Sequence, residues 1–254
     1  GLYGGYSSDT AFMLGSLIQV VLEQGRVEDG EQLARAMVGI FERTGAPDDS
    51  FGLALARGLL ADSLVAQGKW KKGLEQFAEI ERGLAGDKGT LDKLLSRNVN
   101  RAIAYVAVGK PDEAVEMLRP ALARQVADFG YEHDRTAMTR GVLSVALAAR
   151  GERREAASEF ARALPALLAH HQRYPGGESG ATGAIQRLRF IIESYLALIA
   201  DAAGTPLADQ MGATAAEAFR LADIARGQAV RRALAASAAR ARISDPDLAD
   251  LARR

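Results

Sequence analysis

Four segments of the chain carry the same pattern, an apolar run that ends in a glycine. The four marker glycines, Gly25, Gly68, Gly109 and Gly151, lie 43, 41 and 42 residues apart. Self-similarity at a period of roughly 20 to 50 residues is typical of stacked-repeat architectures. Because each repeat in such a stack contacts only its neighbours, the stack presents a long concave surface. The period therefore predicts a recognition protein rather than an enzyme with an enclosed active site.

The residues around each marker glycine are also in register. A small residue stands five positions after the glycine, an apolar residue nine positions after it, and a mostly small residue seven positions before it. Small residues let two helices approach closely, while large ones fill the layer between neighbouring pairs. The three sets are Gly30, Gly73, Ala114 and Ala156; Ala34, Phe77, Leu118 and Phe160; and Ile18, Ala61, Ala102 and Ser144.

Composition and spacing predict helices along nearly the whole chain. Ala, Leu, Arg, Glu and Gln dominate, and the breaks coincide with clusters of glycine and proline. The marker glycines fit tight turns, because a helix exit favours a positive φ angle. Pro111 and Pro246 fit the first turn of a helix. The expected helices span 9–24, 28–44, 50–67, 70–85, 89–108, 112–128, 134–150, 153–173, 183–203, 212–226, 228–242 and 245–254.

Two stretches match a known repeat most clearly. They are Gly-Lys-Trp-Lys-Lys-Gly-Leu-Glu-Gln-Phe77 and Gly-Lys-Pro-Asp-Glu-Ala-Val-Glu-Met-Leu118, and with the register above they resemble the tetratricopeptide repeat (TPR) over about 11–170. The long period is similar to that of kinesin light chains and bacterial relatives. The resemblance implies an all-α fold, a right-handed TPR superhelix (α-solenoid) of about five helix pairs over 11–226. Residues 183–226 would form the fifth pair, with a stretched turn at 201–209, and further helices would follow at the C-terminus.

Charge balance and residue inventory exclude several classes of function. Lys+Arg and Asp+Glu both number 32, whereas proteins that bind nucleic acids or acidic membranes carry a basic excess. The chain has no cysteine, which excludes thiolate catalysis and cysteine-ligated zinc. No segment reaches 18 apolar residues without a charge, so no membrane span is expected. We therefore expect no nucleic-acid and no membrane partner.

The histidines and one glycine-rich loop suggest little chemistry. His170 and His171 are adjacent near a helix end, and adjacent helical residues do not face each other as metal ligands would. His133 lies in a turn at 130–136, where we expect Asp134 to cap the next helix. The loop at 176–183 lacks the Gly-Lys-Ser/Thr ending and the preceding strand of a phosphate loop. We expect a fragment that is not an enzyme and holds no metal or cofactor.

The inner groove is the best candidate site, because the TPR resemblance implies that the first helix of each pair lines the concave side. An arginine fork can clamp carboxylates there, and asparagine both donates and accepts. The aligned polar residues are Arg57, Asn98, Asn100, Arg101 and Arg140, with Phe12, Leu55, Val99 and Met138 as an apolar floor. Arg101 replaces an apolar residue, which requires either pairing with an acid such as Asp62 or exposure to a ligand. The alternative is a structural salt-bridge network between repeats.

Residues 215–254 depart from the repeat. Ala-Phe-Arg-Leu-Ala-Asp leads to Arg226-Gly227, an alanine-rich stretch follows, and Asp245-Pro-Asp-Leu comes next. This order resembles the junction at which TPRs precede a CHAT domain, a caspase-like cysteine protease, in bacterial proteins; the alternative is a capping helix pair. The resemblance implies a helical extension at 227–254, with the catalytic His and Cys beyond Arg254. Residues 1–10 are expected to be a disordered or tag-like N-terminus.

These resemblances imply a module that binds a protein or peptide in its concave groove. In the parent protein, which would be bacterial and cytoplasmic, the module would act as the sensor or regulatory arm of a CHAT protease. Two alternatives remain open: a stand-alone TPR adaptor or scaffold, and a receptor of the bacterial peptide-pheromone type. The oligomeric state is also open.

Overall fold

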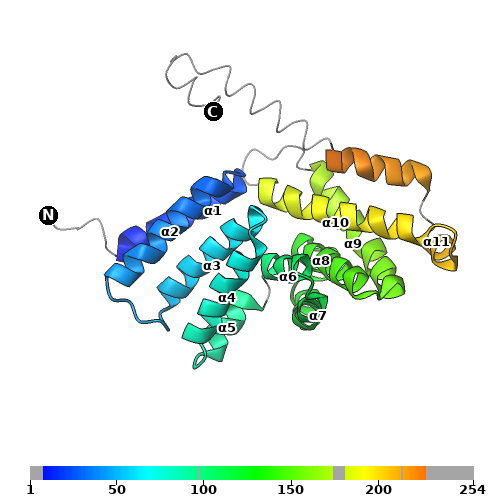
Figure 1. Ribbon diagram of the computed structural model, residues 1–254. Helices are drawn as coiled ribbons and strands as arrows, with labels where there is room; N and C mark the ends of the chain where they lie inside the picture. Colours follow the sequence, from blue (N-terminus) through cyan, green and yellow to red (C-terminus); the bar gives the residue numbers. More distant parts are fainter. Residues whose placement is uncertain (1–7, 97, 174–180, 213, 227–254) are drawn as a thin grey trace, which may run out of the picture.

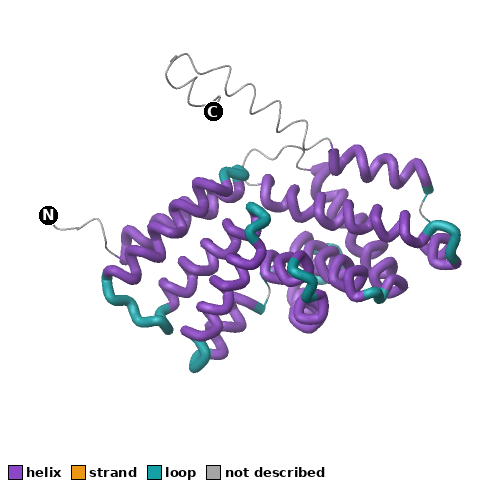
Figure 2. The backbone as a smooth tube through the Cα atoms, in the orientation of Figure 1, coloured by secondary structure: helices purple, strands orange, loops and turns teal. Residues whose placement is uncertain are grey.

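The computed structural model describes residues 8–96, 98–173, 181–212 and 214–226. These residues form helices and short connections, with no strand among them (Figures 1 and 2). Residues 215–226 are also helical. The helices are α1 (Ser8–Glu23), α2 (Val27–Arg43), α3 (Phe51–Ala66), α4 (Trp70–Gly83), α5 (Lys88–Leu95), α6 (Val99–Ala107), α7 (Pro111–Phe129), α8 (Asp134–Arg150), α9 (Arg153–Arg173), α10 (Ala181–Ala202) and α11 (Pro206–Met211).

The helices stack as pairs, which confirms the all-α solenoid. The pairs are α1–α2, α3–α4, α6–α7 and α8–α9, and each first helix packs on the next first helix: α1 on α3, α3 on α6, and α6 on α8. No comparably close contact joins α2 to α4, α4 to α7 or α7 to α9 within the described residues. The first helices therefore lie on the inner side of the arc that Figure 1 shows.

All four marker glycines adopt the positive φ angles that the sequence predicts. Their φ values are 76° for Gly25, 75° for Gly68, 78° for Gly109 and 89° for Gly151. A residue with a Cβ rarely adopts this left-handed conformation, so glycine ends the first helix of each pair at low cost. The repeat is therefore punctuated by backbone geometry as well as by its apolar pattern.

The aligned small and large positions form the core. Ala114 and Ala156 are fully buried, and a Cβ added at Gly73 would lie 2.6 Å from Cγ2 of Val65 in the preceding helix. Phe77 and Phe160 are at most 1% exposed. Close helix pairs with large apolar residues between them are what the register predicts.

The helix expected at 89–108 is wrong, because two helices, α5 and α6, occupy this stretch. Asn98 leaves the helical conformation at ψ 98°, and its side-chain Oδ1 accepts a hydrogen bond from the N–H of Arg101 at 3.0 Å. This is an N-cap, which satisfies one of the free N–H groups at the start of α6. The break turns Asn98 and Asn100 towards α3, where they meet Asp62.

Two further details differ from expectation. His133 rather than Asp134 is the N-cap residue of α8, and its Nδ1 accepts a hydrogen bond from the N–H of Arg135 at 3.2 Å. The stretched turn after α10 contains a short helix, α11, with Pro206 in its first turn. Pro111 stands in the first turn of α7, as predicted.

Helix α10 does more than begin a fifth pair. It packs on α8 and α9, and its N-terminal end also contacts α1, so it runs along the inner side of the arc (Figure 1). Gly141 of α8 permits this approach, because a Cβ there would lie 2.6 Å from Cδ1 of Ile191 in α10. The inner groove therefore has α10 across it.

Several expectations fall on residues outside the described ones. These are the tag-like residues 1–7, the loop at 174–180, and the extension at 227–254 with its expected helices and Pro246. Helix α1 begins at Ser8, within the stretch expected to precede the solenoid. Among the helices that are described, none is both long and apolar enough to cross a bilayer.

Candidate functional site

Helix α10 divides the inner groove into two cavities. The first, here named the α1–α10 cavity, has a volume of about 610 Å³ and is lined by residues of α1, α3, α6 and α10, with single residues from α2 and α4. The second, the α8–α10 cavity, has a volume of about 360 Å³ and is lined by residues of α6 to α10. Ala184 and Arg187 of α10 line both cavities. Volumes of this size suit peptides and other small ligands.

The α1–α10 cavity combines apolar walls with a small polar set, the usual composition of a ligand site. Its apolar residues include Leu59, Val65, Trp70, Ile103 and Phe190. Its polar residues include Gln19, Asp62, Asn100, Gln186 and Arg187. Its charged residues are Asp62 of α3 and Arg187, Arg189 and Glu193 of α10, and Arg189 and Glu193 pair with each other at 2.6 Å. Asp62 and Arg187 meet only because α10 crosses the groove.

Asp62 is held by the two asparagines at the start of α6. Its Oδ1 accepts hydrogen bonds from Nδ2 of Asn98 at 3.2 Å and from Nδ2 of Asn100 at 3.0 Å. Burial raises the pKa of Asp62, and the two amides and the positive charge of Arg187 offset that rise only in part. The carboxylate is thus fixed in position while its charge remains poorly compensated.

Arg187 is the complementary group on α10. Its Nη1 donates to Oδ1 of Asn100 over 3.4 Å, and its buried Nε has no acceptor among the described residues. Burial lowers the pKa of Arg187, and the nearby charge of Asp62 opposes that shift. The two opposite charges interact through space, yet no direct ion pair joins them in the described structure. Both groups therefore keep hydrogen-bonding capacity inside the cavity.

The three arginines expected to form a ladder are not brought together. Arg101 pairs with Glu81 of α4, not with Asp62, and its Nη2 also donates to the Tyr105 hydroxyl at 2.9 Å. Its guanidinium also lies 5.4 Å from the centre of the Tyr105 ring. These contacts leave Arg101 little freedom to meet a ligand.

Arg57 and Arg140 lie in separate places. Arg57 lies 3.9 Å from carboxylate oxygens of both Glu42 and Asp48, at the loop between α2 and α3. Nε of Arg140 lies 3.2 Å from Oε2 of Glu159 in α9, and its guanidinium lies 5.3 Å from the centre of the Tyr131 ring. These contacts favour the alternative of a structural salt-bridge network for the arginines.

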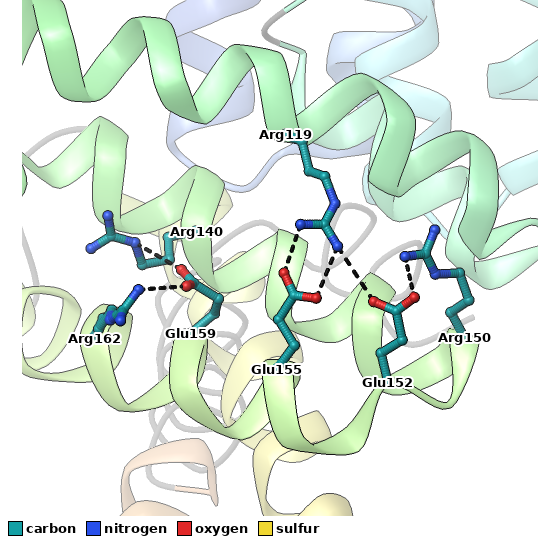
Figure 3. A network of polar contacts seen from close by, with 7 residues as sticks. All are labelled: Arg119, Arg140, Arg150, Glu152, Glu155, Glu159 and Arg162. Atoms are coloured by element: carbon teal, nitrogen blue, oxygen red, sulfur yellow. Dashed lines mark hydrogen bonds and ion pairs between the residues drawn. The ribbon is translucent and has the colours of Figure 1, made fainter.

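Figure 3 shows this network between α7, α8 and α9. Arg119 donates to both carboxylate oxygens of Glu155, at 2.6 and 2.9 Å, and reaches Glu152 at 3.4 Å. Arg150 also pairs with Glu152, while Arg140 and Arg162 share Glu159. The bond to Glu155 raises the pKa of Arg119, and the same bond lowers the pKa of Glu155. The network joins neighbouring helices and lines neither groove cavity.

The remaining predicted residues divide between the groove and the core. Asn100 lines the α1–α10 cavity, and Val99 and Met138 line the α8–α10 cavity. Leu55 is half-buried against the core of α1, α2 and α3. Phe12 belongs to α1, but its side chain is outside the described ones.

Sequence reasoning missed Arg187, Trp70 and Phe190. Gly204 has a positive φ, 73°, like the marker glycines, but it stands 53 residues after Gly151. Because of this longer spacing, the helix expected at 183–203 was not aligned with the first helices of the four repeats. Arg187 also lies further from its glycine than any of the aligned candidates. The one sequence feature that could have indicated the different course of α10 is the length of its segment, 22 residues.

His170 lines the α8–α10 cavity, which the sequence did not suggest. Within the described part of the chain, no three side chains of His, Cys, Asp or Glu are grouped as they would be around a metal ion. The groove therefore offers hydrogen bonds, charged groups of both signs and apolar surface.

Comparison with known proteins supports the repeat assignment. Residues 94–169 match the tetratricopeptide repeat family model. A crystal structure of a putative kinesin light chain of Podosopora anserina, with nearly identical TPR-like repeats, is similar over 89% of this chain and 98% of that one, with 18% identity and a TM-score of 0.51. A second crystal structure of that protein, a single-substitution variant, covers 87% and 94% with 19% identity and the same TM-score. No curated protein matches the chain. At this identity the likeness shows the fold, a TPR-like solenoid.

Proposed function

We propose that this chain is a recognition module that holds a protein or peptide segment in its inner groove. TPR repeats suggest protein–protein interaction, and the repeat match at 94–169 covers the helices that form the centre of the groove. The observation that carries the proposal is the pair of cavities on either side of Arg187. Together they offer apolar walls and a few polar groups, the combination that peptide grooves use.

The partner segment would contact residues from both sides of α10. Val99 and Met138 provide apolar contact in one cavity, and Asn100 and Arg187 provide hydrogen bonds at the boundary with the other. Because α10 lies across the groove, a long partner would either thread between the cavities or displace the N-terminal half of α10. Either event would change the contact between α10 and α1.

The finer proposal is that this change regulates a caspase-like protease. Helix α10 leads through α11 to residues 215–254, the segment that resembles a CHAT junction. A shift of α10 would therefore reach the residues nearest the protease. We place this protein in the bacterial cytoplasm and assign it no cofactor, no nucleic-acid partner and no membrane partner. Sequencing the parent gene past Arg254 tests this proposal. We expect a β-rich domain with one His and one later Cys, each at the end of an apolar strand pattern. A stop codon or a different domain would contradict the link to a protease.

The groove itself is tested by site-specific photo-crosslinking in lysate of the host cell. A benzoyl-phenylalanine at Met138, inside the α8–α10 cavity, should give adducts with one or a few proteins. The same residue at Glu116, exposed on α7 outside both cavities, is the matched control. Adducts that are absent at Met138, or identical at the two positions, would contradict the groove as the binding site.

One observation favours the adaptor or scaffold alternative. Met13, Leu17 and Val20 lie on one face of α1 and are 75%, 47% and 46% exposed. Light scattering that shows self-association, abolished by Leu17→Ser, would favour that alternative; a monomer would remove this support. The pheromone-type receptor differs in ligand size, and thermal stabilisation by short peptides would favour it.

A further inference from the structure

We propose that the α1–α10 cavity binds a small zwitterion, an α-amino acid with a large apolar side chain. Its carboxylate would lie at Arg187 and its ammonium group at Asp62. The inference rests on the proposed recognition role of the groove and adds the chemical class of one ligand. It uses Asp62 and Arg187, two opposite charges that line the same cavity and are both bonded to Asn100, with no direct ion pair between them in the described structure.

Arg187 is the anchor for the carboxylate. Its single hydrogen bond is the long one from Nη1 to Asn100, and its buried Nε has no acceptor. A guanidinium is always protonated and binds carboxylates through two parallel N–H donors. Leaving part of such a cation buried without an acceptor is costly, so an anionic ligand is the natural complement. Burial already lowers the pKa of Arg187, and a bound carboxylate would reverse that shift.

Asp62 is the anchor for the ammonium group. Its Oδ1 is occupied by Asn98 and Asn100, but no described residue donates a hydrogen bond to Oδ2. The two amides hold the carboxylate in one orientation, so it is preorganised for a cationic donor. Burial raises the pKa of Asp62, which a nearby ammonium charge would lower again.

The apolar walls set the side chain of the ligand. Trp70, Ile103 and Phe190 line the same cavity as the two charges, and the volume of about 610 Å³ accommodates the largest amino acids. Apolar contact area would favour phenylalanine or leucine over glycine. A ligand that lacks either charge would leave Asp62 or Arg187 uncompensated and bind more weakly.

Binding would also join two parts of the fold. Asp62 belongs to α3, and Arg187 belongs to the N-terminal half of α10. A ligand held by both residues would fix α10 against the first helices. A partner segment would then have to bind with α10 in this position or displace it. The amino acid would therefore act as an effector of the groove.

Calorimetry on the full chain with phenylalanine, leucine and glycine tests the inference. We expect binding that strengthens in the order glycine, leucine, phenylalanine. N-acetyl-phenylalanine and phenylalanine amide, which each lack one charge, should bind at least about tenfold more weakly. These analogues need no variant, so their result does not depend on folding.

Variants of Arg187 and Asp62 test which residue binds which charged group of the ligand. Arg187→Gln should abolish the preference for phenylalanine over its amide, and Asp62→Asn the preference over its N-acetyl form. The matched control is the double variant Arg153→Gln with Asp201→Asn. These two exposed residues lie outside the cavity and form an ion pair with an N–O distance of 3.3 Å, so their replacement should leave binding unchanged. Equal binding of the amide and the free acid to the wild-type chain would overturn the inference.

The remaining outcomes are also decisive. Binding of tetrapeptides but of no free amino acid would overturn the assignment in favour of a peptide ligand. If no zwitterion binds while the Met138 crosslink still captures a partner, this inference fails and the proposed function stands. If both experiments are negative, both fail.

Discussion

The molecule contains two polar networks on its helices, and they differ in how well their charges are compensated. In the network between α7, α8 and α9, Glu152, Glu155 and Glu159 each lie within ion-pair distance of an arginine (Figure 3). The pKa shifts of Arg119 and Glu155 favour their charged forms. Beneath α10, the pKa shifts of Asp62 and Arg187 run the other way. The first network has the properties of structural support, and the second has those of a binding site.

The largest expected effect is in the compensated network. Arg140→Ala leaves Glu159 with only the exposed Arg162, although the Arg140 and Glu159 side chains are 6% and 14% exposed. Breaking a buried pair from one side costs about 3 kcal/mol, which lowers Tm by roughly 6–12 °C in a chain of this size. Thermal unfolding measures it. The control is Arg162→Ala, which removes a 62% exposed partner and should cost less than about 1 kcal/mol. Equal losses would show that Arg140 is not a buried support.

A second compensated site, around Glu31, should give a pH-dependent effect. Bonds from Lys69, Arg35 and Gln67 lower the pKa of Glu31 from 4.5 to about 2. Because the folded pKa is depressed, the stabilisation is present above pH 4.5 and disappears as the pH falls towards 2. Glu31→Gln should cost about 1 to 2 kcal/mol at pH 7, since Lys69 and Arg35 are largely exposed.

Urea unfolding of the wild-type chain and of Glu31→Gln at pH 7, 4.5 and 3 measures that difference. The two curves should converge as the pH falls. A gap that stays constant with pH would mean that the carboxylate charge contributes nothing.

Asn98 caps α6 and also holds Asp62, and its replacement should have a smaller effect on the free energy of unfolding. Asn98→Ala removes the acceptor for the Arg101 N–H and one donor to Asp62. It should cost about 1 kcal/mol of unfolding free energy, the usual value of an N-cap. Asn98→Asp keeps the cap but places a second carboxylate beside Asp62. It should therefore restore the free energy of unfolding, measured in urea, but weaken ligand binding in the α1–α10 cavity. Recovery of both stability and ligand binding would contradict the role of Asn98 in holding Asp62.

The smallest effect, and the sharpest contrast, is expected beneath α10. Asp62→Asn combined with Arg187→Gln removes two poorly compensated charges from a half-buried site. Replacing such a pair by neutral groups is often neutral or stabilising, so the free energy of unfolding should stay within about 1 kcal/mol of wild type or rise. Calorimetric unfolding checks this, and a loss of several kcal/mol would show that the pair supports the fold.

The repeat could be predicted from the sequence because its determinants are local. Each marker glycine sets its own turn, and each small residue contacts a helix about ten residues away. The split at Asn98 was missed because helix propensity across 89–108 is good, although Asn98 caps α6 through the N–H of Arg101 and also bonds Asp62, 36 residues earlier.

The site was less accessible to sequence reasoning for the same physical reason. The sequence suggested Asp62 as a partner for Arg101, but the partner is Glu81 of α4. Which side of α4 faces Arg101 depends on how the helix pairs stack. Arg187 meets Asn100 across 87 residues, because α10 crosses the groove. Such contacts depend on the curvature of the whole stack, which no single repeat encodes.

If the uncompensated cluster beneath α10 belongs to the recognition site and the compensated network does not, only the first should affect partner binding. The yield of the Met138 crosslink can be compared in three chains: wild type, Arg187→Gln and Arg162→Gln. We expect the partner adduct to be lost in Arg187→Gln and retained in Arg162→Gln. Equal yields in all three chains would contradict this expectation.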